Sequence, residues 1–489
     1  MLRILSAVLF AATGWAQPAA YLEAFRPQFH FSPARNWTND PNGLVYLEGE
    51  YHLFFQFNPL GDRWGHMSWG HAVSRDLVHW SELPVALPEE NGVMIFTGST
   101  VVDQHNSSGF FAGTKPCLVA IYTGHTPETA ARAALQTQNL AYSNDRGRTW
   151  TKYAQNPVLD LHLSDFRDPK VLWSDRAQRW VMAVALPNDH KVRFYGSSDL
   201  KHWQGLSEFG PAGATGGQWE CPELFELPVE SKPGETRWVL KVGLNPGGLQ
   251  GGSGEQYFIG QFDAARFTND NASSLTLWTD YGKDCYCALT FNNLPRTQSQ
   301  VMLGWMNNWQ YAADVPTKPW RGQMTVPRKL ALRETPEGLR LVQNPIDSLE
   351  QLRQPWRLES GAYEIRVRAA LGSAKEVGWK LETGDAAFTL VGFDREKQQL
   401  FVDRTHSGDT SFSQSFPART TAPLHLNGNE LHLHMLVDRS SIEVFADNGI
   451  IALTNLIFPP SGTRRVEFYS KGGQTGAIQT ERWALSSIW

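Results

Sequence analysis

The sequence predicts an all-β protein whose larger part is a five-bladed β-propeller, and three observations point to that fold. Short runs rich in β-branched and aromatic residues, bounded by Gly, Pro and Asn, fill the chain, and few helical stripes interrupt them. A turn motif recurs three times, and a second motif, an acidic residue followed by proline and two strands, recurs in the same region. Such recurrence is typical of a repeat architecture.

The turn motif marks the spacing of the predicted blades. It reads SRDLVHW from residue 74, SNDRGRTW from residue 143 and SSDLKHW from residue 197. In each copy we expect the Asp to accept backbone N–H bonds in a tight turn, and the Trp to pack into the neighbouring sheet layer. The copies start 69 and 54 residues apart, the scale of a four-stranded blade. Chance similarity of common turn chemistry is the alternative.

The second motif opens a blade each time. NDPNGLVYLEGEYHLFFQF, FRDPKVLWSDRAQRWVMAVAL and ECPELFELPVESKPGETRWVLKVGL each begin with an acid, then proline within two residues, then two strands. The acids are Asp40, Asp168 and Glu220. FTGSTVVD is the matching segment between the first two, with Thr97 in place of the acid, and DYGKDCYCALTF followed by VMLGWMNNW makes a fifth. The count is therefore five blades.

The repeat also predicts where the three acids lie. The innermost strands of a propeller run along the central channel, so equivalent positions meet at one mouth of it. Asp40, Asp168 and Glu220 are thus expected to share a pocket although they are far apart in sequence. The alternative for Asp40 is a plain turn residue, because Asp-Pro-Asn-Gly is common turn chemistry.

The composition and the N-terminal residues limit which classes of protein the chain can belong to. A chain of 489 residues predicts two or three domains, and a net charge of −5 without basic runs among aromatics excludes nucleic acid as a partner. Nineteen tryptophans suit the C–H faces of sugars. The start MLRILSAVLFAATGWAQ predicts a signal peptide over residues 1–16; a membrane anchor is the alternative, but the run is too short to span. We expect a secreted or periplasmic protein with no membrane partner.

The chain has four cysteines, which is few for an exported protein of this length. Cys285 and Cys287 are two apart and would face the same side of a strand, while Cys117 and Cys221 stand alone. No Cys or His pattern has metal-ligand spacing. We therefore expect free, buried cysteines, no metal and no cofactor.

The motifs WTNDPNG, FRDPK and WECPELF, with long flanks such as FFQFNPLGDRWGHMSWGHAVSRDLVHW and VDRSSIEVFADNGIIALTNLIFP, resemble those of the glycoside hydrolases that cleave β-fructofuranosides. That family includes invertases, exo-inulinases and levanases. The resemblance implies a five-bladed β-propeller, placed at about residues 22–340, followed by a β-sandwich at about 356–489. Alternating runs such as AYEIRVRA and IEVFA fit strands in the second part.

The resemblance also implies roles for the acids. Asp40 would be the nucleophile, Glu220 the acid and then the base, and Asp168 would steady the sugar through its ring hydroxyls. A retaining glycosidase needs one ionised and one protonated carboxyl group roughly 5 Å apart.

Further positions match those that hold the fructosyl unit in the family. Arg167 could in addition orient Asp168. For the aromatic members of this set, packing within the blades is the alternative. The matching residues are Asn39, Gln56, Trp64, Phe96, Thr97, Arg167 and Trp305.

The sequence thus predicts an exo-acting β-fructosidase that releases fructose from levan, inulin or sucrose, and it is more similar to fructan-degrading members than to plain invertases. Fructosyl transfer and endo-cleavage would use the same acids. A carbohydrate-binding propeller without catalysis would not need three buried acids. A glycosidase acting on arabinans or xylans would invert configuration and need a wider carboxylate separation. Oligomeric state and the role of the sandwich stay open.

Overall fold

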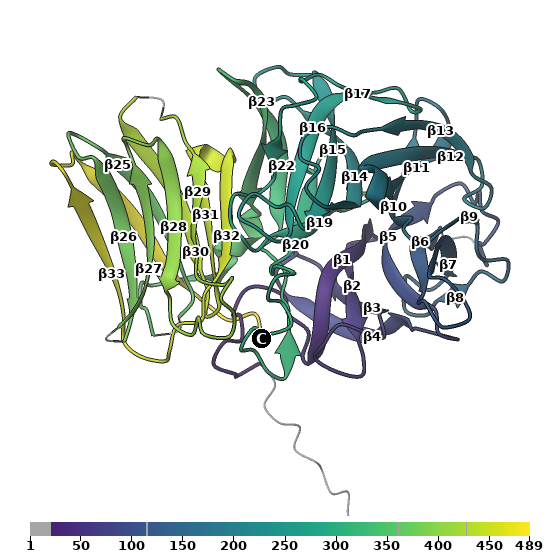
Figure 1. The fold of residues 1–489 in the computed structure, drawn as a ribbon, viewed down its shortest axis with the longest axis horizontal. Helices are drawn as coiled ribbons and strands as arrows, with labels where there is room; N and C mark the ends of the chain where they lie inside the picture. The colour runs from purple at the N-terminus through teal and green to yellow at the C-terminus, as the bar shows by residue number, and fades with distance from the viewer. Residues whose placement is uncertain (1–20, 114–115, 360, 385, 427) are drawn as a thin grey trace, which may run out of the picture.

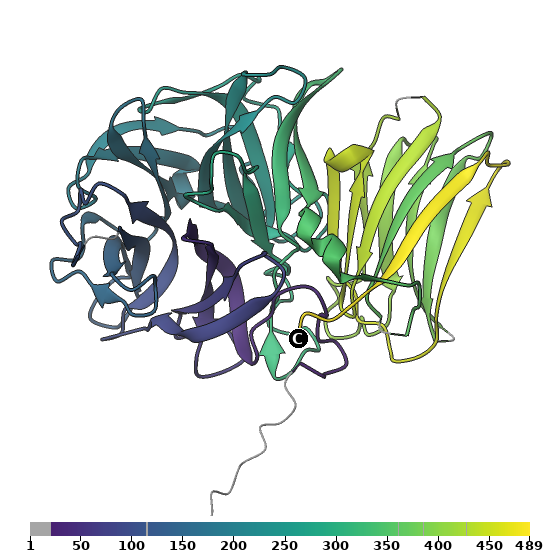
Figure 2. The same cartoon turned by 180° about the vertical axis from the view of Figure 1, so that it is seen from behind.

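The computed structural model describes residues 21–489 except 114–115, 360, 385 and 427, and it consists of two β-rich parts side by side (Figure 1; seen from behind in Figure 2). It confirms the predicted fold class, a five-bladed β-propeller followed by a β-sandwich. The predicted signal peptide lies outside the described residues. Within the described part of the chain, no helix is long and apolar enough to cross a membrane.

Five sheets form the blades; their strands pair antiparallel from the innermost strand outward, and in blade one a short extra strand also pairs parallel with the innermost one. Blade one holds β1 (Asn36–Leu47), β2 (Glu50–Asn58), β3 (Ser68–Ser74) and β4 (Trp80–Leu87), with the short β21 (Trp320–Arg321) beside β1. Blade two holds β5 (Met94–Asp103), β6 (Cys117–Thr126), β7 (Leu135–Ser143), β8 (Thr151–Lys152) and β9 (Leu159–Leu163). Blade three holds β10 (Arg167–Ser174), β11 (Arg179–Leu186), β12 (Lys191–Ser197) and β13 (Gln204–Phe209). Blade four holds β14 (Gln218–Pro228), β15 (Thr236–Asn245), β16 (Gly254–Phe262), β17 (Phe267–Asn269) and β18 (Leu277–Trp278). Blade five holds β19 (Tyr286–Thr290), β20 (Val301–Trp305), β22 (Arg328–Thr335) and β23 (Gly338–Pro345).

The innermost strands close a ring. In the middle of the propeller, β1 contacts β5, β5 contacts β10, β10 contacts β14, β14 contacts β19, and β19 returns to β1 (Figure 1). Each inner strand breaks register with its neighbour near its start, at one β-bulge in four blades and at two in β1. A bulge bends its strand and re-aims the side chains there. The bulges therefore turn equivalent positions of the five blades toward one mouth of the channel.

The turn motif behaves as predicted. Asp76 accepts backbone N–H bonds at 2.8 and 2.9 Å, and Asp145 and Asp199 accept the corresponding bonds in the other copies. Trp150 of blade two packs edge-on against Phe54 of blade one, with ring centres 5.4 Å apart. The turn of blade two thus packs against blade one.

Two sheets make up the sandwich and enclose a core of alternating apolar side chains. One sheet holds β24 (Arg353–Gln354), β34 (Ile478–Leu485), β25 (Tyr363–Ala370), β30 (Glu430–Val437), β31 (Ser441–Ala446) and β32 (Ile451–Leu456). The other holds β29 (Arg419–Pro423), β28 (Gln399–His406), β27 (Ala387–Asp394), β26 (Glu376–Thr383) and β33 (Arg464–Lys471). Short 3-10 turns lie at η1 (Pro187–Asp189), η2 (Asp347–Leu352) and η3 (Asp447–Gly449).

Buried charges join the two parts of the molecule. Arg328 of blade five lies 3.0 Å from Asp280 of the propeller and 3.1 Å from Glu443 of the sandwich. His30, ahead of blade one, lies 2.8 Å from Asp438 of the sandwich. Because all these side chains are buried, the interface depends on their mutual pairing.

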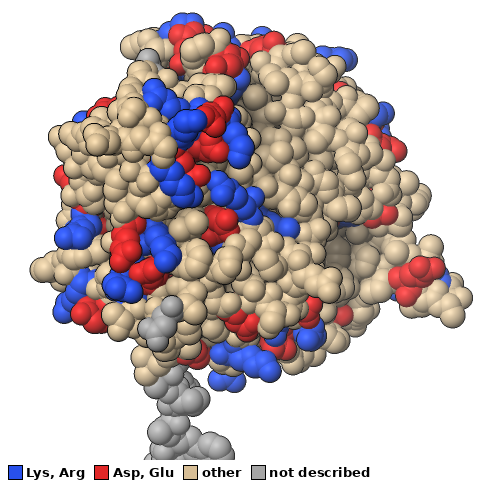
Figure 3. Space-filling view, turned by 60° about the vertical axis from the view of Figure 1, so that its left-hand side comes forward, with Lys and Arg blue, Asp and Glu red and all other residues tan. Residues whose placement is uncertain are grey.

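The surface charges do not gather by sign on the face that Figure 3 shows, where blue and red side chains intermingle. In the sandwich, for example, Lys471 forms an ion pair with Glu376 at 2.8 Å. Each such pair contributes little to stability.

Candidate active site

Three acids from three blades line one cavity. Asp40 comes from β1, Asp168 from β10 and Glu220 from β14. The cavity has a volume of about 350 Å³. Its walls are Asn39, Asp40, Gln56, Trp64, Phe96, Thr97, His125, Gln136, Asp165, Arg167, Asp168, Glu220, Asn245 and Trp309. A larger cavity of about 790 Å³, between blade five and the sandwich, contains none of the three acids.

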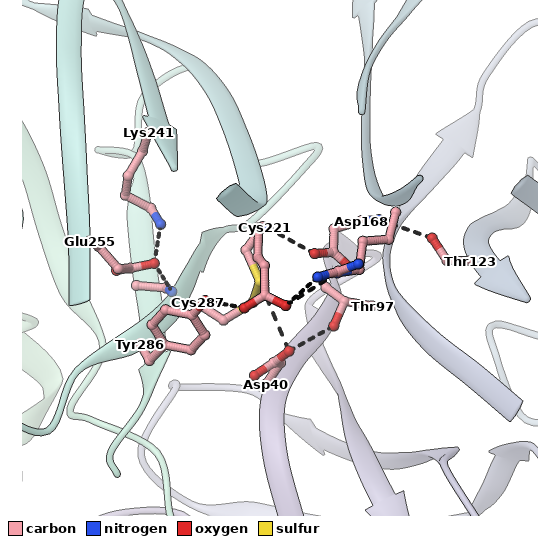
Figure 4. The surroundings of a disulfide bond; sticks show 12 residues. Asp40, Thr97, Thr123, Asp168, Cys221, Lys241, Glu255, Tyr286 and Cys287 are labelled. Atoms are coloured by element: carbon pink, nitrogen blue, oxygen red, sulfur yellow. Dashed lines mark hydrogen bonds and ion pairs between the residues drawn. A yellow bond between two sulfur atoms is a disulfide. The ribbon is translucent and has the colours of Figure 1, made fainter. Parts of the chain in front are cut away.

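Asp40 is buried with one oxygen held and one unused. Thr97 Oγ1 donates to Asp40 Oδ2 at 2.9 Å, while Oδ1 has no hydrogen-bond partner among the described residues (Figure 4). Burial and the nearby charges of Asp168 and Glu220 raise the pKa of Asp40 to about 7. Asp40 itself lies on the cavity wall, next to Asn39 and Thr97.

Asp168 lies in a left-handed backbone conformation, with φ of 67°, at the bulge of β10. The backbone N–H of Cys221 donates to Asp168 Oδ2 at 2.8 Å. Burial raises the pKa of Asp168 to about 7; Glu220 adds to this rise, and the positive charge of Arg167 opposes it. Both aspartates thus hold protons more tightly than ordinary carboxyl groups.

Glu220 is held from two sides. Arg167 Nε and Nη2 donate to Glu220 Oε1 at 3.1 and 2.9 Å, and the hydroxyl of Tyr286 donates to Oε2. The expectation that Arg167 orients Asp168 is wrong, because the guanidinium donates to the carboxylates of Glu220 and, at 2.8 Å, of Asp165 instead. Arg167 reaches across from β10 because the inner strands of adjacent blades run side by side.

The other expected sugar contacts lie on the cavity wall, with one exception. Gln56 Nε2 donates to the carbonyl of Ile95 at 2.9 Å, so its buried amide is partly satisfied by backbone. Trp64 is 46% exposed at the rim and meets Phe96 edge-on, with ring centres 6.0 Å apart. Asn39 and Thr97 lie beside Asp40 on the wall.

The exception is Trp305, whose predicted sugar contact does not fit the structure. Its side chain is fully buried and does not line the cavity. It packs between Trp37 and Trp309, with ring centres 6.1 and 4.9 Å away. Trp309, four residues later in the same GWMNNW run, takes the place on the wall.

Sequence reasoning missed several other residues of the site. Tyr286 gave no signal, because a tyrosine in a strand is ordinary core, yet its hydroxyl reaches Glu220. Asp165 could have been found from its place two residues before Arg167. His125 stacks on Phe96 with ring centres 4.4 Å apart, a contact between strands that no local pattern shows. The remaining wall residues that were missed are Gln136, Asn245 and Trp309.

The prediction of free cysteines is wrong for two of the four. Cys221 and Cys287 form a disulfide, with Cα atoms 5.5 Å apart, while Cys117 and Cys285 are free and buried. Cys285 and Cys287 do not share a face, because the bulge of β19 interrupts the alternation at Cys287. Among the described residues, Asp40 and these two joined cysteines form the one close group of metal-ligand types. Disulfide sulfurs have lost the thiolate that binds a metal.

Two family models match the chain. Residues 30–345 match the N-terminal domain of glycosyl hydrolases family 32, and residues 330–484 match the C-terminal part of the same family.

Similar proteins include a levanase of Bacillus subtilis, 46% identical over 513 residues that cover 100% of this chain and 74% of the levanase. An extracellular exo-inulinase of Aspergillus niger is 40% identical, with 100% of both chains covered. The crystal structure of an exo-inulinase from Aspergillus awamori has a TM-score of 0.91 at 40% identity, and covers 96% of this chain and 100% of its own. A fructofuranosidase from Schwanniomyces occidentalis complexed with fructose has a TM-score of 0.83 at 33% identity, and covers 96% and 97%.

Proposed function

The chain belongs to glycosyl hydrolase family 32, and from this premise we propose that it is an exo-acting β-fructofuranosidase that releases terminal fructose from β-linked fructans. Relatives named levanase and exo-inulinase, at 46% and 40% identity, support a fructan rather than sucrose alone as the substrate. A cavity of about 350 Å³ is at the small end for ligand sites, which suits one terminal sugar rather than a chain running through.

The observation that carries the proposal is the meeting of three carboxyl groups in that cavity. A retaining glycosidase needs two of them, as nucleophile and as acid. Burying acids together is destabilising, because each loses hydration and repels the others. A propeller that only bound sugar would gain nothing from this arrangement, so the trio favours catalysis.

In the proposed reaction, Asp40 attacks the anomeric carbon of the terminal fructosyl unit while Glu220 gives its proton to the leaving glycosidic oxygen. The bond between that carbon and that oxygen breaks, and an ester joins the sugar to Asp40. Glu220 then takes a proton from water, which attacks the anomeric carbon and releases the Asp40 carboxylate. The place of Asp40 on the cavity wall, together with Glu220, supports Asp40 as the attacking group.

Asp168 and Arg167 have supporting roles in this scheme. Asp168 would hydrogen-bond the ring hydroxyls as positive charge develops on the sugar. Arg167 holds Glu220 toward the cavity through two N–H groups. Because the pKa of Asp40 is raised to about 7, this carboxyl group must first lose its proton before it can attack, and the share of ionised Asp40 grows as pH rises toward about 7. Activity is therefore expected to fall in acidic solution, as Asp40 becomes protonated.

Export is part of the proposal. The signal-like start of the sequence, the word extracellular in the name of the exo-inulinase relative and the disulfide all support an oxidising compartment outside the cytosol.

The test is a time course with sucrose, inulin and levan offered separately, and Asp40→Asn as the inactive control. Free fructose from the start, without shorter oligomers, is the expected result, with a faster rate on a fructan than on sucrose. Early oligosaccharides would mean endo-cleavage, and lengthening products would mean fructosyl transfer. Binding without any cleavage would overturn the enzyme assignment in favour of a sugar-binding propeller.

A further inference from the structure

We propose that the Cys221–Cys287 disulfide is a positioning element of the active site, holding the donors that set Asp168 and Glu220 in place. This inference rests on the proposed function and adds to it two residues that lie behind the reacting groups. The bond joins β14 of blade four to β19 of blade five, and Cys221 lies beside Asp168 and Asp40 (Figure 4).

Each cysteine lies at a point where its strand makes no ladder pairing with the neighbouring strand. The pairing of β14 with β15 stops after Glu220 and resumes at Glu223, and the pairing of β19 with β20 stops after Tyr286 and resumes at Leu289. Cys221 and Cys287 fall inside these two gaps, in left-handed conformations with φ of 47° and 45°. Non-glycine residues rarely adopt that conformation without surrounding support.

No backbone ladder joins the two bulges, because β14 and β19 belong to different sheets. The disulfide is therefore the covalent link between two segments that ladder hydrogen bonds leave free at this point. Both cysteines are buried, Cys221 2% and Cys287 0% exposed, so the link lies in the interior of the protein.

Both linked segments carry donors to the acids. The N–H of Cys221 itself donates to Asp168 Oδ2 at 2.8 Å. Tyr286, directly before Cys287, donates its hydroxyl to Glu220 Oε2. Cys221 Sγ also lies 3.9 Å from Asp40 Oδ2. Because this sulfur is part of the disulfide, it carries no hydrogen and contacts the carboxylate as an apolar atom. The residues that this bond links, or their direct neighbours, therefore contact all three acids.

The test compares Cys287→Ala with Cys285→Ala. The control residue lies two positions earlier, is also buried, and is a free thiol without contact to the acids. We expect Cys287→Ala to lower kcat on the preferred fructan about 10-fold or more, because small misplacements of reacting groups are costly to rate. Cys285→Ala should keep the kcat of the wild type.

The pH profile separates positioning from mere stability. Asp168 faces Asp40, Glu220 and Arg167, and losing the Cys221 N–H raises its pKa. The acid limb of kcat/KM should therefore move to higher pH in Cys287→Ala, and stay in place in Cys285→Ala. A lower Tm with unchanged kcat and unchanged pH profile would overturn the inference, because a purely structural bond would behave in that way.

Two further measurements keep the outcome clear. The denatured wild type should expose two reactive thiols before reduction and four after it; four before reduction would overturn the inference. The double variant Cys221→Ser/Cys287→Ser, whose hydroxyls can hydrogen-bond each other, replaces Cys287→Ala if that variant does not fold, with the same expected shifts. A wild type that releases no fructose would overturn the proposed function and this inference together, whereas an active wild type with an unaffected Cys287→Ala overturns the inference alone.

Discussion

At the scale of residues, the buried acids that the proposed reaction needs lower the stability of the folded protein when they are ionised. The pKa of Asp40 is raised from 3.8 to about 7 in the folded protein, so between these pH values the folded state binds more protons than the unfolded state. The stability linked to Asp40 is therefore present at low pH and is lost as pH rises through about 7. A neutral side chain at this position would escape the loss.

Asp40→Asn should therefore be inactive and yet more stable than the wild type in alkaline solution. We expect a gain on the order of a few kcal/mol at about pH 8, and little difference at about pH 4, where Asp40 is already protonated. Urea unfolding at the two pH values measures this. Asp175→Asn, at a position 70% exposed, is the matched control and should change neither activity nor stability. An equal effect of Asp40→Asn at both pH values would contradict the assignment.

The two neighbouring tryptophans should separate binding from packing. Trp309→Ala removes a wall of the cavity, and should raise KM several-fold with little loss of stability. Trp305→Ala removes a fully buried ring, and should lower the free energy of unfolding by about 3–5 kcal/mol. Steady-state kinetics and denaturant unfolding of both variants measure these effects. A raised KM in Trp305→Ala, with a loss of stability in Trp309→Ala, would show that Trp305 is the residue that contacts the sugar.

What the sequence could predict at this scale was the type of residue and its blade. The three acids could be found because they recur at equivalent places. Trp305 and Trp309 could not be told apart, because both belong to one short run and the chain turns between them. The partner of Cys221 is 66 residues away and in another blade, so no local pattern could reveal the disulfide.

At the scale of elements, the bulges explain why strand alternation failed as a guide to the site. A period of two predicts which side chains share a face only while the register holds. Each inner strand breaks register where the site begins. The blade spacing could be predicted from turn chemistry, but the bulges could not, because they depend on how each inner strand pairs with the next strand of its blade.

Gly243 offers a test at this scale. It lies opposite Glu220 on β15, and a Cβ added there would come within 2.9 Å of the ring of Tyr286. Gly243→Ala should push that ring aside, weaken its bond to Glu220 and lower kcat/KM about 10-fold or more, since the acid would be misplaced. Gly205→Ala on β13, where the nearest atom belongs to the flexible side chain of Arg193, should leave kcat/KM unchanged. Normal kinetics in Gly243→Ala would show that the site does not need the ring in this place.

At the scale of the whole molecule, the sandwich is tied to the propeller by buried charges. His30, ahead of blade one, contacts Asp438 of the sandwich at 2.8 Å and lies 3.9 Å from Glu443. Burial alone would lower the pKa of His30, but Asp438 and Glu443 raise it to about 9. The five-bladed count and the strands of the second part were predictable from sequence. This junction was not, because its partners are about 400 residues apart.

The junction should make stability fall in alkaline solution. Because the pKa of His30 is raised above 6.5, its stabilising effect is complete below about pH 6.5 and is lost as pH rises through about 9. His30→Gln should lower Tm clearly at about pH 6 and much less at about pH 10. Scanning calorimetry at both pH values measures this, with exposed His162→Gln as control. A Tm difference that does not depend on pH would contradict a charged His30.

The central claim is that Asp40 and Glu220 act as a retaining pair on a terminal fructosyl unit. The most direct measurement is the anomeric form of the fructose first released from inulin or levan, followed by NMR before mutarotation. The β-fructofuranose form, with the configuration of the substrate, is the predicted first product. The α form would mean a single inverting displacement, and would contradict the role assigned to Asp40.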